Sequence, residues 1–381
     1  MHIAFVKKRF SLRCGGSERY TVTLSRQFQK LGHQVSVIGE HIDEDLTDEV
    51  EFIPVKTNRL TSAAHNHSFA VRAGHIADQR NFDIVYGIGR AYGLDAVRVT
   101  ERLQSHWLGV RYRNGISRAL QRINPRHRTL IELERVIYNS DSVRRVVTQS
   151  HLDRELVQKY YNVPEHKLRT IYNGVDTELF HPGVKSERNV VRDELGISAD
   201  AQLLVFASMD FEGKGLRSIL RAIAYSKHRE TELLVLGTGP VRKFQRIAEQ
   251  LGIARRIHFA GRRSDIQRCY GAGDLFILPT AYEPFPNVNL EAMACGLPVM
   301  TSTTSGGADI VTPGETGWLV PTVHSVDEMI DGINLHFDLT GRELEAMSAR
   351  CVQTAQQMPI ENNIRQTLQL FEEVLDEKRA A

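Results

Sequence analysis

The sequence predicts an α/β fold with two doubly wound parallel sheets, one in each half of the chain. Short apolar runs of the kind that form buried strands alternate with helical patterns throughout the 381 residues. The alternation begins at Ile3–Val6 and starts again at Gln202–Ser208. Between the two series lies a polar, charged stretch from Glu178 to Asp200 that contains proline and glycine. We interpret it as the linker between two domains.

In the first series, a glycine turn follows the opening strand. Ser17 is a favourable N-cap for a helix that runs to Leu31 and stops at Gly32. The other strands expected in this half are Gln34–Ile38, Phe52–Val55, Ile84–Tyr86, Val143–Thr148 and Leu168–Tyr172.

In the second series, apolar residues at helical spacing form one helix face: Leu216, Ile219, Leu220, Ile223 and Ala224. Glu361–Glu377 has the pattern of a last amphipathic helix. The dinucleotide-binding pattern Gly-x-Gly-x-x-Gly is absent from the chain, which argues against a dehydrogenase. The later strands expected are Leu233–Leu236, Ile257–Phe259, Leu275–Pro279 and Pro298–Thr301.

Composition argues against several classes of protein, among them nucleic-acid-binding, membrane-spanning and disulfide-rich proteins. A net charge of +2 is too close to balance to indicate a nucleic-acid partner. No apolar run approaches the roughly 18 residues of a membrane span. The four cysteines are widely spaced with no Cys-x-x-Cys pair, which fits reduced thiols better than disulfides or zinc. Because the N-terminus reads as a strand and not as a signal peptide, we expect a cytoplasmic location.

Two glutamates in the second half point to a ligand site. Glu283 follows the apolar run Asp274–Pro279, and Glu291 lies in the helical run Asn287–Cys295 that Gly296 ends. Open α/β sheets bind ligands beyond the carboxyl ends of their strands, and a helix N-terminus suits an anion. Since carboxylates accept hydrogen bonds from hydroxyls, this arrangement suits a ligand with a sugar at each end and phosphate between them.

These residues are part of a wider resemblance. The chain resembles the retaining nucleotide-sugar glycosyltransferases of the two-domain GT-B class, in the branch called family 4, whose hallmark is two glutamates separated by seven residues. Five ordered segments carry the resemblance across nearly the whole chain: Gly15-Gly16, Asn173–Asp176, Tyr282–Val299, Ser305–Val311 and Gly314–Val320.

The resemblance implies two Rossmann-like domains that face a cleft. The N-terminal domain, residues 1–178, would bind the acceptor. The C-terminal domain, residues 179–357, would bind the nucleotide sugar, and the last helix, residues 358–378, would pack back on the N-terminal domain.

The resemblance also assigns roles at the donor site. Glu283 would accept hydrogen bonds from the donor sugar, and Glu291 from the ribose hydroxyls. Backbone N–H groups of Phe285, Asn287 and Val288 would face the ligand, whereas Pro286 has none to offer.

Lys214 matches the family's phosphate-binding lysine, and it would stabilise the charge of the leaving nucleoside diphosphate. The family's arginine beside it is not matched, because Glu212 and Gly213 occupy the nearby positions. Because of this departure, other arginines would have to replace the missing one in binding phosphate. The departure also favours, to some extent, the alternative that the protein binds its ligand without catalysing a reaction. Further candidates at the site are Gly15 and Gly16 near phosphate, His106 and Asp95 as catalytic groups, and Arg217, Arg262 or Arg263 as replacements for the arginine.

Metal-dependent glycosyltransferases use an Asp-x-Asp motif. Asp43 and Asp45 have that spacing, but they lie in an acidic run that is better read as a solvated loop. His65 and His67 have no third ligand nearby. We therefore expect an enzyme that needs no metal and no cofactor other than its donor substrate.

A basic stretch from Glu101 to Arg128 is interleaved with aromatic and aliphatic side chains. Such a stretch is typical of a segment that binds an anionic membrane surface. A solvated basic face and a site for an anionic acceptor both remain open. The residues singled out for membrane or acceptor contact are Arg102, Trp107, Arg111, Arg113, Arg118 and Arg122.

The function predicted is transfer of a hexose with retention, with UDP-glucose expected as donor from the family alone. Among relatives, the chain is most similar to enzymes that glucosylate a heptose of the lipopolysaccharide inner core at the inner face of the cytoplasmic membrane. The alternatives are another glycolipid, an exopolysaccharide or a soluble sugar as acceptor, or a silent protein that binds nucleotide or a lipid surface.

Overall fold

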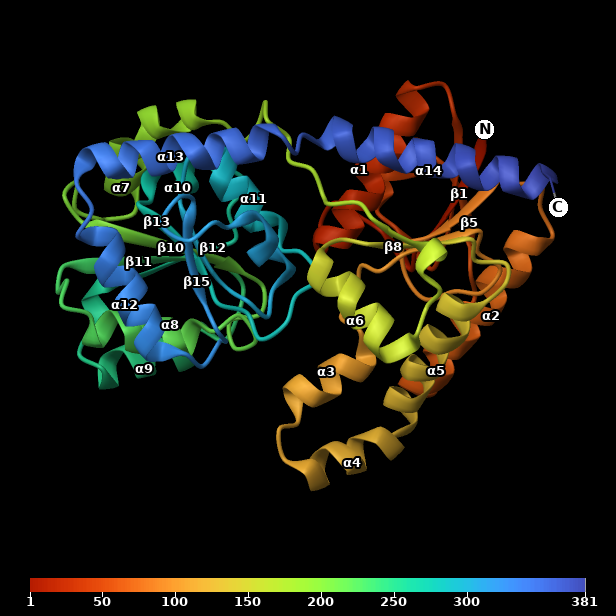
Figure 1. Ribbon diagram of the computed structural model, residues 1–381, viewed down its shortest axis with the longest axis horizontal. Helices are drawn as coiled ribbons and strands as arrows, with labels where there is room; N and C mark the ends of the chain where they lie inside the picture. The colour runs from red at the N-terminus through yellow and green to blue at the C-terminus, as the bar shows by residue number, and fades with distance from the viewer. Residues whose placement is uncertain (381) are drawn as a thin grey trace. The chain divides into compact units, whose positions relative to one another are not determined.

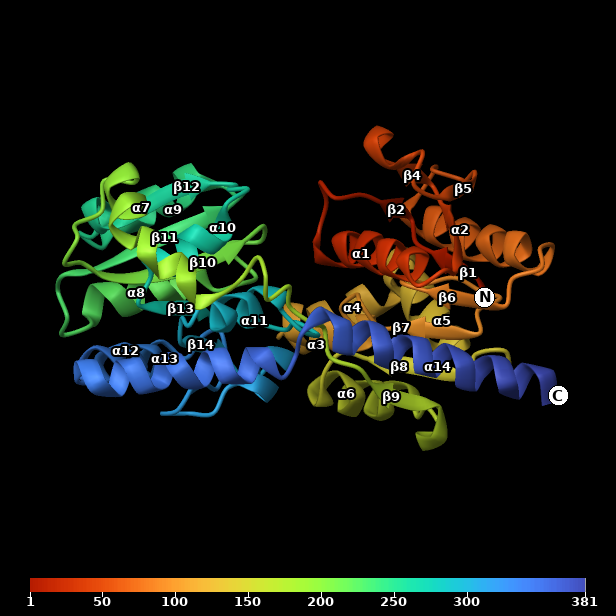
Figure 2. The same ribbon diagram turned by 90° about the horizontal axis from the view of Figure 1, so that it is seen from above.

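Two parallel β-sheets organise the chain, and each belongs to its own compact unit (Figures 1 and 2). The computed structural model describes residues 1–380. The N-terminal unit comprises Met1–Tyr172 and the residues from Glu361 onward, and the C-terminal unit comprises Asn173–Ile360. The predicted α/β class with two parallel sheets is confirmed.

The N-terminal sheet has the order β5-β3-β1-β6-β7-β8-β9, with all described strand pairs parallel. This is the doubly wound order 3-2-1-4-5-6 with one further strand at the edge, so the order reverses between β1 and β6. The strands are β1 His2–Val6, β3 Gln34–Gly39, β5 Glu51–Pro54, β6 Ile84–Gly87, β7 Ala96–Arg98, β8 Arg145–Thr148 and β9 Leu168–Thr170.

Apolar faces of helices cover this sheet. Phe28 of the first helix stacks on Phe5 of β1, and Phe371 of the last helix meets both Phe28 and Tyr86 of β6. The last helix lies beside the first along this sheet in both views (Figures 1 and 2). The helices are α1 Gly16–Lys30, α2 Ser62–Asp78, α3 Gln104–Arg111, α4 Gly115–Ile123, α5 Pro125–Asn139, α6 His151–Tyr161 and α14 Ile360–Ala380. A two-stranded pair, β2 Arg9–Phe10 with β4 His41–Ile42, lies outside the main sheet.

The C-terminal sheet repeats the same order in six strands, β12-β11-β10-β13-β14-β15, and reverses between β10 and β13. Its strands are β10 Gln202–Ser208, β11 Thr231–Gly237, β12 Ile257–Gly261, β13 Leu275–Leu278, β14 Val299–Ser302 and β15 Gly317–Val320. Its helices are α7 Arg188–Glu194, α8 Leu216–Tyr225, α9 Val241–Gln250, α10 Ile266–Ala272, α11 Asn287–Ala294, α12 Val326–Phe337 and α13 Gly341–Gln356.

Two expectations about local structure are wrong. Ser17 does not cap α1, because the N-cap is Gly15 and the Ser17 hydroxyl instead accepts a hydrogen bond from Lys7 at 2.8 Å. The stretch from Glu178 to Asp200 is not a linker. It forms the 3₁₀ helix η3 (Pro182–Glu187) and α7, and it is anchored by Arg192, whose guanidinium is 1% exposed and donates to the carbonyl of Ala272.

Candidate active site

The loops after β10 and β13 touch at the point where the C-terminal strand order reverses. Gly215 has φ +81°, and a Cβ added there would lie 2.5 Å from the carbonyl oxygen of Pro279. The amide of Ala281 donates to the carbonyl of Gly213 at 3.1 Å. Glycine at position 215 therefore permits both the left-handed backbone and the close approach of the two loops.

This contact brings two predicted site residues together. The Lys214 ammonium donates to Oε2 of Glu283 and forms an ion pair with it. The Lys214 side chain is 12% exposed and the Glu283 side chain 25%. A cation and a carboxylate from different loops thus meet at the carboxyl edge of the sheet, where such folds bind ligands.

The Ser305–Val311 segment is fixed to the same loop. The amide of Gly306 donates to the carbonyl oxygen of Glu283 at 2.9 Å. Ser305 caps the short 3₁₀ helix η5 (Gly306–Ile310) by accepting from the amide of Gly307 at 3.1 Å. Two of the segments that carry the family resemblance are therefore neighbours in space.

Helix α11 begins directly after this loop. Its N-cap is Pro286, and no side chain caps it. As at any helix start, the first amides have no partner within the helix, and Asn287 and Val288 occupy these positions. Phe285 before them is 4% exposed and holds the loop against the core. The helix start is thus suited to an anion.

Glu291 lies one turn into α11. Its Oε2 accepts a hydrogen bond from the hydroxyl of Tyr270 at 3.3 Å. Burial, and then the charge of Glu291, raise the pKa of Tyr270 well above its usual value, so this tyrosine stays a neutral donor. Sequence reasoning missed Tyr270, because it belongs to α10 and carries no motif.

Asn173 is a second residue whose place the sequence did not reveal. Its side-chain amide donates to Oδ1 of Asn287 at 2.6 Å, at the first residue of α11. Asn173 opens the Asn173–Asp176 segment, so the family resemblance was the available signal. The contact orients the start of the helix.

The residues near the missing arginine form a charge cluster. Glu212 accepts hydrogen bonds from Lys243 of α9 at 2.5 Å and from Arg217 of α8 at 3.4 Å. The carboxylate at this position thus gathers two cations beside the loop that carries Lys214. Sequence analysis named Arg217 but not Lys243. The only sequence signal for Lys243 was its place soon after the glycines that follow β11.

The other two arginines lie farther along the sheet. Arg262 is exposed and follows β12, which is the edge strand. Arg263 is bound to Asp265 through both carboxylate oxygens at 2.7 Å.

In the N-terminal unit, the glycine turn stands at the start of α1. Gly15 is the N-cap and Gly16 the first residue of the helix. Lys7, which directly follows β1 and is 4% exposed, lies 3.3 Å from Glu18 in the first turn. A cation is therefore already neutralised beside these glycines.

His106 lies on α3. One ring nitrogen is 3.3 Å from the hydroxyl of Tyr160 on α6. Burial, and then the positive charge of Lys159, lower the pKa of His106 to about 4, so the imidazole is neutral at physiological pH.

Asp95 precedes β7, at the amino end of the strands. It accepts hydrogen bonds from the amide of Val85 at 2.7 Å and from Lys378 of α14 at 2.9 Å. Asp95 therefore ties the last helix to the amino ends of the strands. Ligands of such folds bind at the opposite edge, beyond the carboxyl ends.

Comparisons with known proteins show the family to which the chain belongs. The family model described as Glycosyltransferase Family 4 matches residues 14–179, and the model described as Glycosyl transferases group 1 matches residues 187–358. The chain belongs to the family 4 glycosyltransferases of the GT-B type.

Two curated relatives illustrate the range of this family. The chain is 24% identical over 319 residues to the lipopolysaccharide glucosyltransferase WaaG of Escherichia coli strain K12, covering 83% of this chain and 84% of WaaG. It is 24% identical over 389 residues to a D-inositol 3-phosphate glycosyltransferase of Corynebacterium aurimucosum, covering 94% of this chain and 90% of that protein.

Solved structures share the fold. The crystal structure of WaaG superposes with a TM-score of 0.84 at 21% identity, covering 97% of this chain and 99% of WaaG. HepE of Anabaena in complex with UDP-glucose superposes with a TM-score of 0.76 at 18% identity, covering 98% and 100% of the two chains.

The basic stretch of this glycosyltransferase includes a helix without a buried face. No residue of α4 is buried, and Figure 1 shows α3 and α4 projecting away from the sheet of their unit. Ile116, Leu120 and Ile123 are 76%, 59% and 67% exposed at helical spacing, so they form one apolar side. Arg102 stacks on Trp107 at 4.4 Å, while Arg111, Arg113, Arg118 and Arg122 belong to α3, α4 and the turn between them.

Two further observations concern metals and membranes. Within residues 1–380, no three histidine, cysteine or acidic side chains form a group that could hold a metal ion. Asp43 of the Asp-x-Asp run accepts hydrogen bonds from Ser11 and from the amide of Leu12. None of the described helices combines the length and the apolar character that crossing a bilayer requires.

Proposed function

We propose that this glycosyltransferase moves glucose from UDP-glucose to a hydroxyl of a membrane-associated glycan and retains the anomeric configuration. The observation that carries the proposal is the meeting of Lys214 and Glu283 where the C-terminal strand order reverses. In this proposal the C-terminal unit binds the donor and the N-terminal unit binds the acceptor.

The site supports a division of roles. Lys214 would leave Glu283 for the diphosphate and stabilise the charge that grows on the leaving group. The first amides of α11 would bind the same anion. Glu283, once released, would accept hydrogen bonds from the glucose hydroxyls, and Glu291 from the ribose.

Protein groups supply the positive charge in this proposal, so no metal is needed. Besides Lys214, the cations Lys243 and Arg217 gather at Glu212 in the adjacent loop. We propose that they replace the phosphate-binding arginine that the family pattern has at this position. His106 stays a proposed contact to the donor sugar as a neutral imidazole, whereas the position of Asp95 gives a catalytic role no support.

The proposed acceptor is a heptose of the lipopolysaccharide inner core, reached at the inner face of the cytoplasmic membrane. Two observations favour it: the relative named as a lipopolysaccharide glucosyltransferase and the exposed apolar, basic helix α4. A helix of this kind can lie in a membrane interface.

A ligand screen tests the donor, and a turnover assay tests the reaction. Thermal shift with UDP- and GDP-sugars should show stabilisation by UDP-glucose above other sugars. Slow hydrolysis of UDP-glucose without acceptor would exclude a silent binding protein. Stabilisation without any hydrolysis or transfer would favour the silent alternative, and transfer to a soluble sugar alone would contradict the lipopolysaccharide acceptor.

A further inference from the structure

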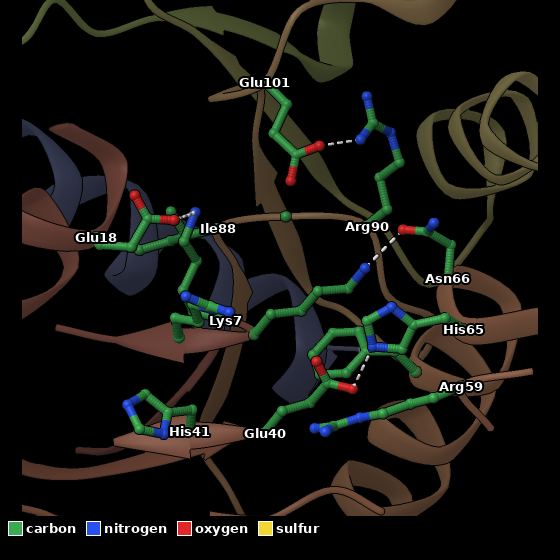
Figure 3. Close-up of a pocket in the computed structure, with 14 residues that line it drawn as sticks. Lys7, Glu18, Glu40, His41, Arg59, His65, Asn66, Ile88, Arg90 and Glu101 are labelled. Atoms are coloured by element: carbon green, nitrogen blue, oxygen red, sulfur yellow. Dashed lines mark hydrogen bonds and ion pairs between the residues drawn. The ribbon is translucent and has the colours of Figure 1, made fainter. Parts of the chain in front are cut away.

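A pocket of about 670 Å³ lies in the N-terminal unit (Figure 3). Residues that follow β1, β3, β6 and β7 line it, so it stands at the carboxyl edge of the sheet. Since β1 and β6 are the strands between which the order reverses, this pocket is the N-terminal counterpart of the site at Lys214. The pocket contains none of the motif residues that identified the family.

Each carboxylate of this pocket already has a hydrogen-bonding or ion-pair partner. Figure 3 shows a basic group beside each of three glutamates. Arg90 has a second acidic partner as well, because its Nε donates to buried Glu134 at 2.9 Å. The pairs are Glu18 with Lys7 at 3.3 Å, Glu40 with His65 at 2.7 Å, and Glu101 with Arg90.

Three other cations line the pocket: Lys8, Arg9 and Arg59. No described carboxylate lies within ion-pair distance of any of them. Five lysines and arginines thus face three carboxylates in the lining. Lysines and arginines therefore outnumber carboxylates by two in the lining, and Lys8, Arg9 and Arg59 are the ones without a described carboxylate within ion-pair distance.

Lys8 is the most confined of the three. Its ammonium donates to the amide oxygen of Asn66 at 2.6 Å and lies 5.3 Å from the ring centre of Phe69. Burial lowers the pKa of Lys8, although the charges of Glu101 and Glu40 act in the opposite direction. A cation held by a neutral partner in a partly dry site is costly, and an anionic ligand would offset that cost.

Arg59 complements Lys8. It is exposed, and Figure 3 shows its side chain along the pocket wall near His65 and Glu40. A guanidinium binds phosphate or carboxylate through two parallel hydrogen bonds. Next to it, Glu40 and Asn66 offer oxygen acceptors of the kind that bind sugar hydroxyls.

We propose that this pocket binds an acceptor sugar that carries an anionic group, a phosphate monoester or a carboxylate, with Lys8 and Arg59 as the ligands of that group. The identification of the ligand as the acceptor rests on the proposed function. The binding of an anionic sugar at this pocket does not.

Calorimetry on the full-length protein tests the proposal with three probes: mannose 6-phosphate, glucuronate and mannose. We expect at least one charged sugar to bind about tenfold more tightly than mannose, since hydrogen bonds to a charged group are stronger than neutral ones. The double variant Lys8→Gln, Arg59→Gln should lose this difference. The two charged probes separate a phosphate-bearing from a carboxylate-bearing ligand.

The control variant Lys30→Gln, Arg342→Gln removes the same two charges at exposed positions outside the pocket and should bind like the wild type. The variant Lys8→Arg, Arg59→Lys keeps both charges and should retain much of the preference. Equal affinity for charged and neutral sugars, or an unchanged preference in the double glutamine variant, would overturn the proposal. So would inorganic phosphate that binds as tightly as mannose 6-phosphate, because the sugar would then contribute nothing.

A second pair of measurements separates this inference from the proposed function. UDP affinity of the double variant should equal that of the wild type, because Lys8 and Arg59 do not belong to the donor unit. Suppose that the double variant loses charged-sugar binding and that the wild type does not turn over UDP-glucose. The pocket assignment would then stand, and the proposed transferase function would be refuted. Normal turnover by a wild type that shows no preference for charged sugars would support the transferase function and refute the pocket assignment.

Discussion

The two halves of this glycosyltransferase use one strand order for two differently charged sites. In each sheet, a lysine follows the first strand and faces a glutamate: Lys214 with Glu283 in the C-terminal unit, and Lys7 with Glu18 in the N-terminal unit. The difference is what surrounds the pair. Both pairs stand near the start of a helix that no side chain caps, but only the N-terminal pair has Lys8, Arg9 and Arg59 beside it, with no described carboxylate within ion-pair distance of these three. The same topology therefore yields, as proposed, a site for a nucleotide in one unit and a site for an anionic sugar in the other.

The largest effect is expected in the N-terminal unit, at the basic stretch. Replacing Arg111, Arg113, Arg118 and Arg122 with glutamine should abolish binding to anionic vesicles. Each basic residue near such a surface contributes about 1 kcal/mol, so affinity should fall about a thousandfold. Co-sedimentation with vesicles of anionic and of neutral lipid measures it.

A matched variant with Arg242, Arg246, Arg255 and Arg342 changed to glutamine removes four exposed charges from the C-terminal unit and should still bind. Wild-type binding should weaken as salt rises. Equal binding to neutral and anionic vesicles, or none to either, would instead leave α4 as a solvated face or an acceptor contact.

Lys214→Ala should lower turnover about 10²- to 10³-fold, since it removes one group that stabilises charge in the transition state. Initial rates of UDP release from UDP-glucose measure the loss. Lys227→Ala is the control, because Lys227 is 58% exposed in an ion pair in the same unit. A near-normal rate for Lys214→Ala would remove this lysine from the mechanism and erase the distinction between the two lysine–glutamate pairs.

Glu291→Ala should weaken UDP binding by about 1–3 kcal/mol, the range for hydrogen bonds of a charged group. Isothermal calorimetry gives the affinity directly. Tyr270→Phe removes the hydroxyl that contacts Glu291 but keeps the carboxylate, so its loss should be smaller. Unchanged UDP affinity in Glu291→Ala would show that this glutamate does not bind the ribose.

The buried histidine His336 should make the stability of the C-terminal unit depend on pH. Burial lowers the pKa of His336 to about 4, below the ordinary 6.5 of the unfolded chain. The unfolded state therefore binds a proton more readily between these values, and stability falls as pH drops from 6.5 toward 4. In His336→Gln, urea unfolding should show a pH slope in this window that is shallower by up to about 1.36 kcal/mol per pH unit. An identical slope in wild type and variant would mean that His336 is not neutral in the folded state.

No effect is expected from metal removal. Transfer should persist in excess EDTA, because Lys214 and its neighbours are proposed to supply the positive charge. Loss of activity that manganese or magnesium restores would contradict this and would return attention to Asp43 and Asp45.

The sequence predicted residues that the structure brings together in the C-terminal unit, because most of them are close together in the chain. Glu283, the helix start and Glu291 lie within nine positions, and their spacing already implies their geometry. Lys214 was found through its place between a strand and a helix. Tyr270 and Lys243 were missed, because only the packing of α10 and α9 brings them to the site.

The N-terminal pocket could not be predicted in the same way. Its lining comes mainly from loops and from helices α1 and α2, between Lys7 and Glu101, and the decisive property is which cation lacks a carboxylate. Pairing depends on side-chain contacts and not on sequence spacing. His65, for example, was considered only for metal binding, yet it forms a hydrogen bond with Glu40, and the neighbouring Asn66 holds Lys8.

Errors in the fold prediction have similar causes. Strand β7 has only three residues, Ala96–Arg98, and was too short to show a pattern. The stretch from Glu178 to Asp200 looked like a linker because it is polar. One of its charged side chains, Arg192, is buried in bonds to distant carbonyl groups and to Asp274.

The most direct measurement follows the fate of UDP-glucose by NMR with lipopolysaccharide truncated at the inner-core heptoses as acceptor. The proposal predicts an α-linked glucose in the product, no product from Glu283→Gln, and normal product from the Lys227→Ala control. A β-linked product, or unchanged transfer by Glu283→Gln, would contradict the assignment of the Lys214–Glu283 site as the centre of a retaining glucosyltransferase.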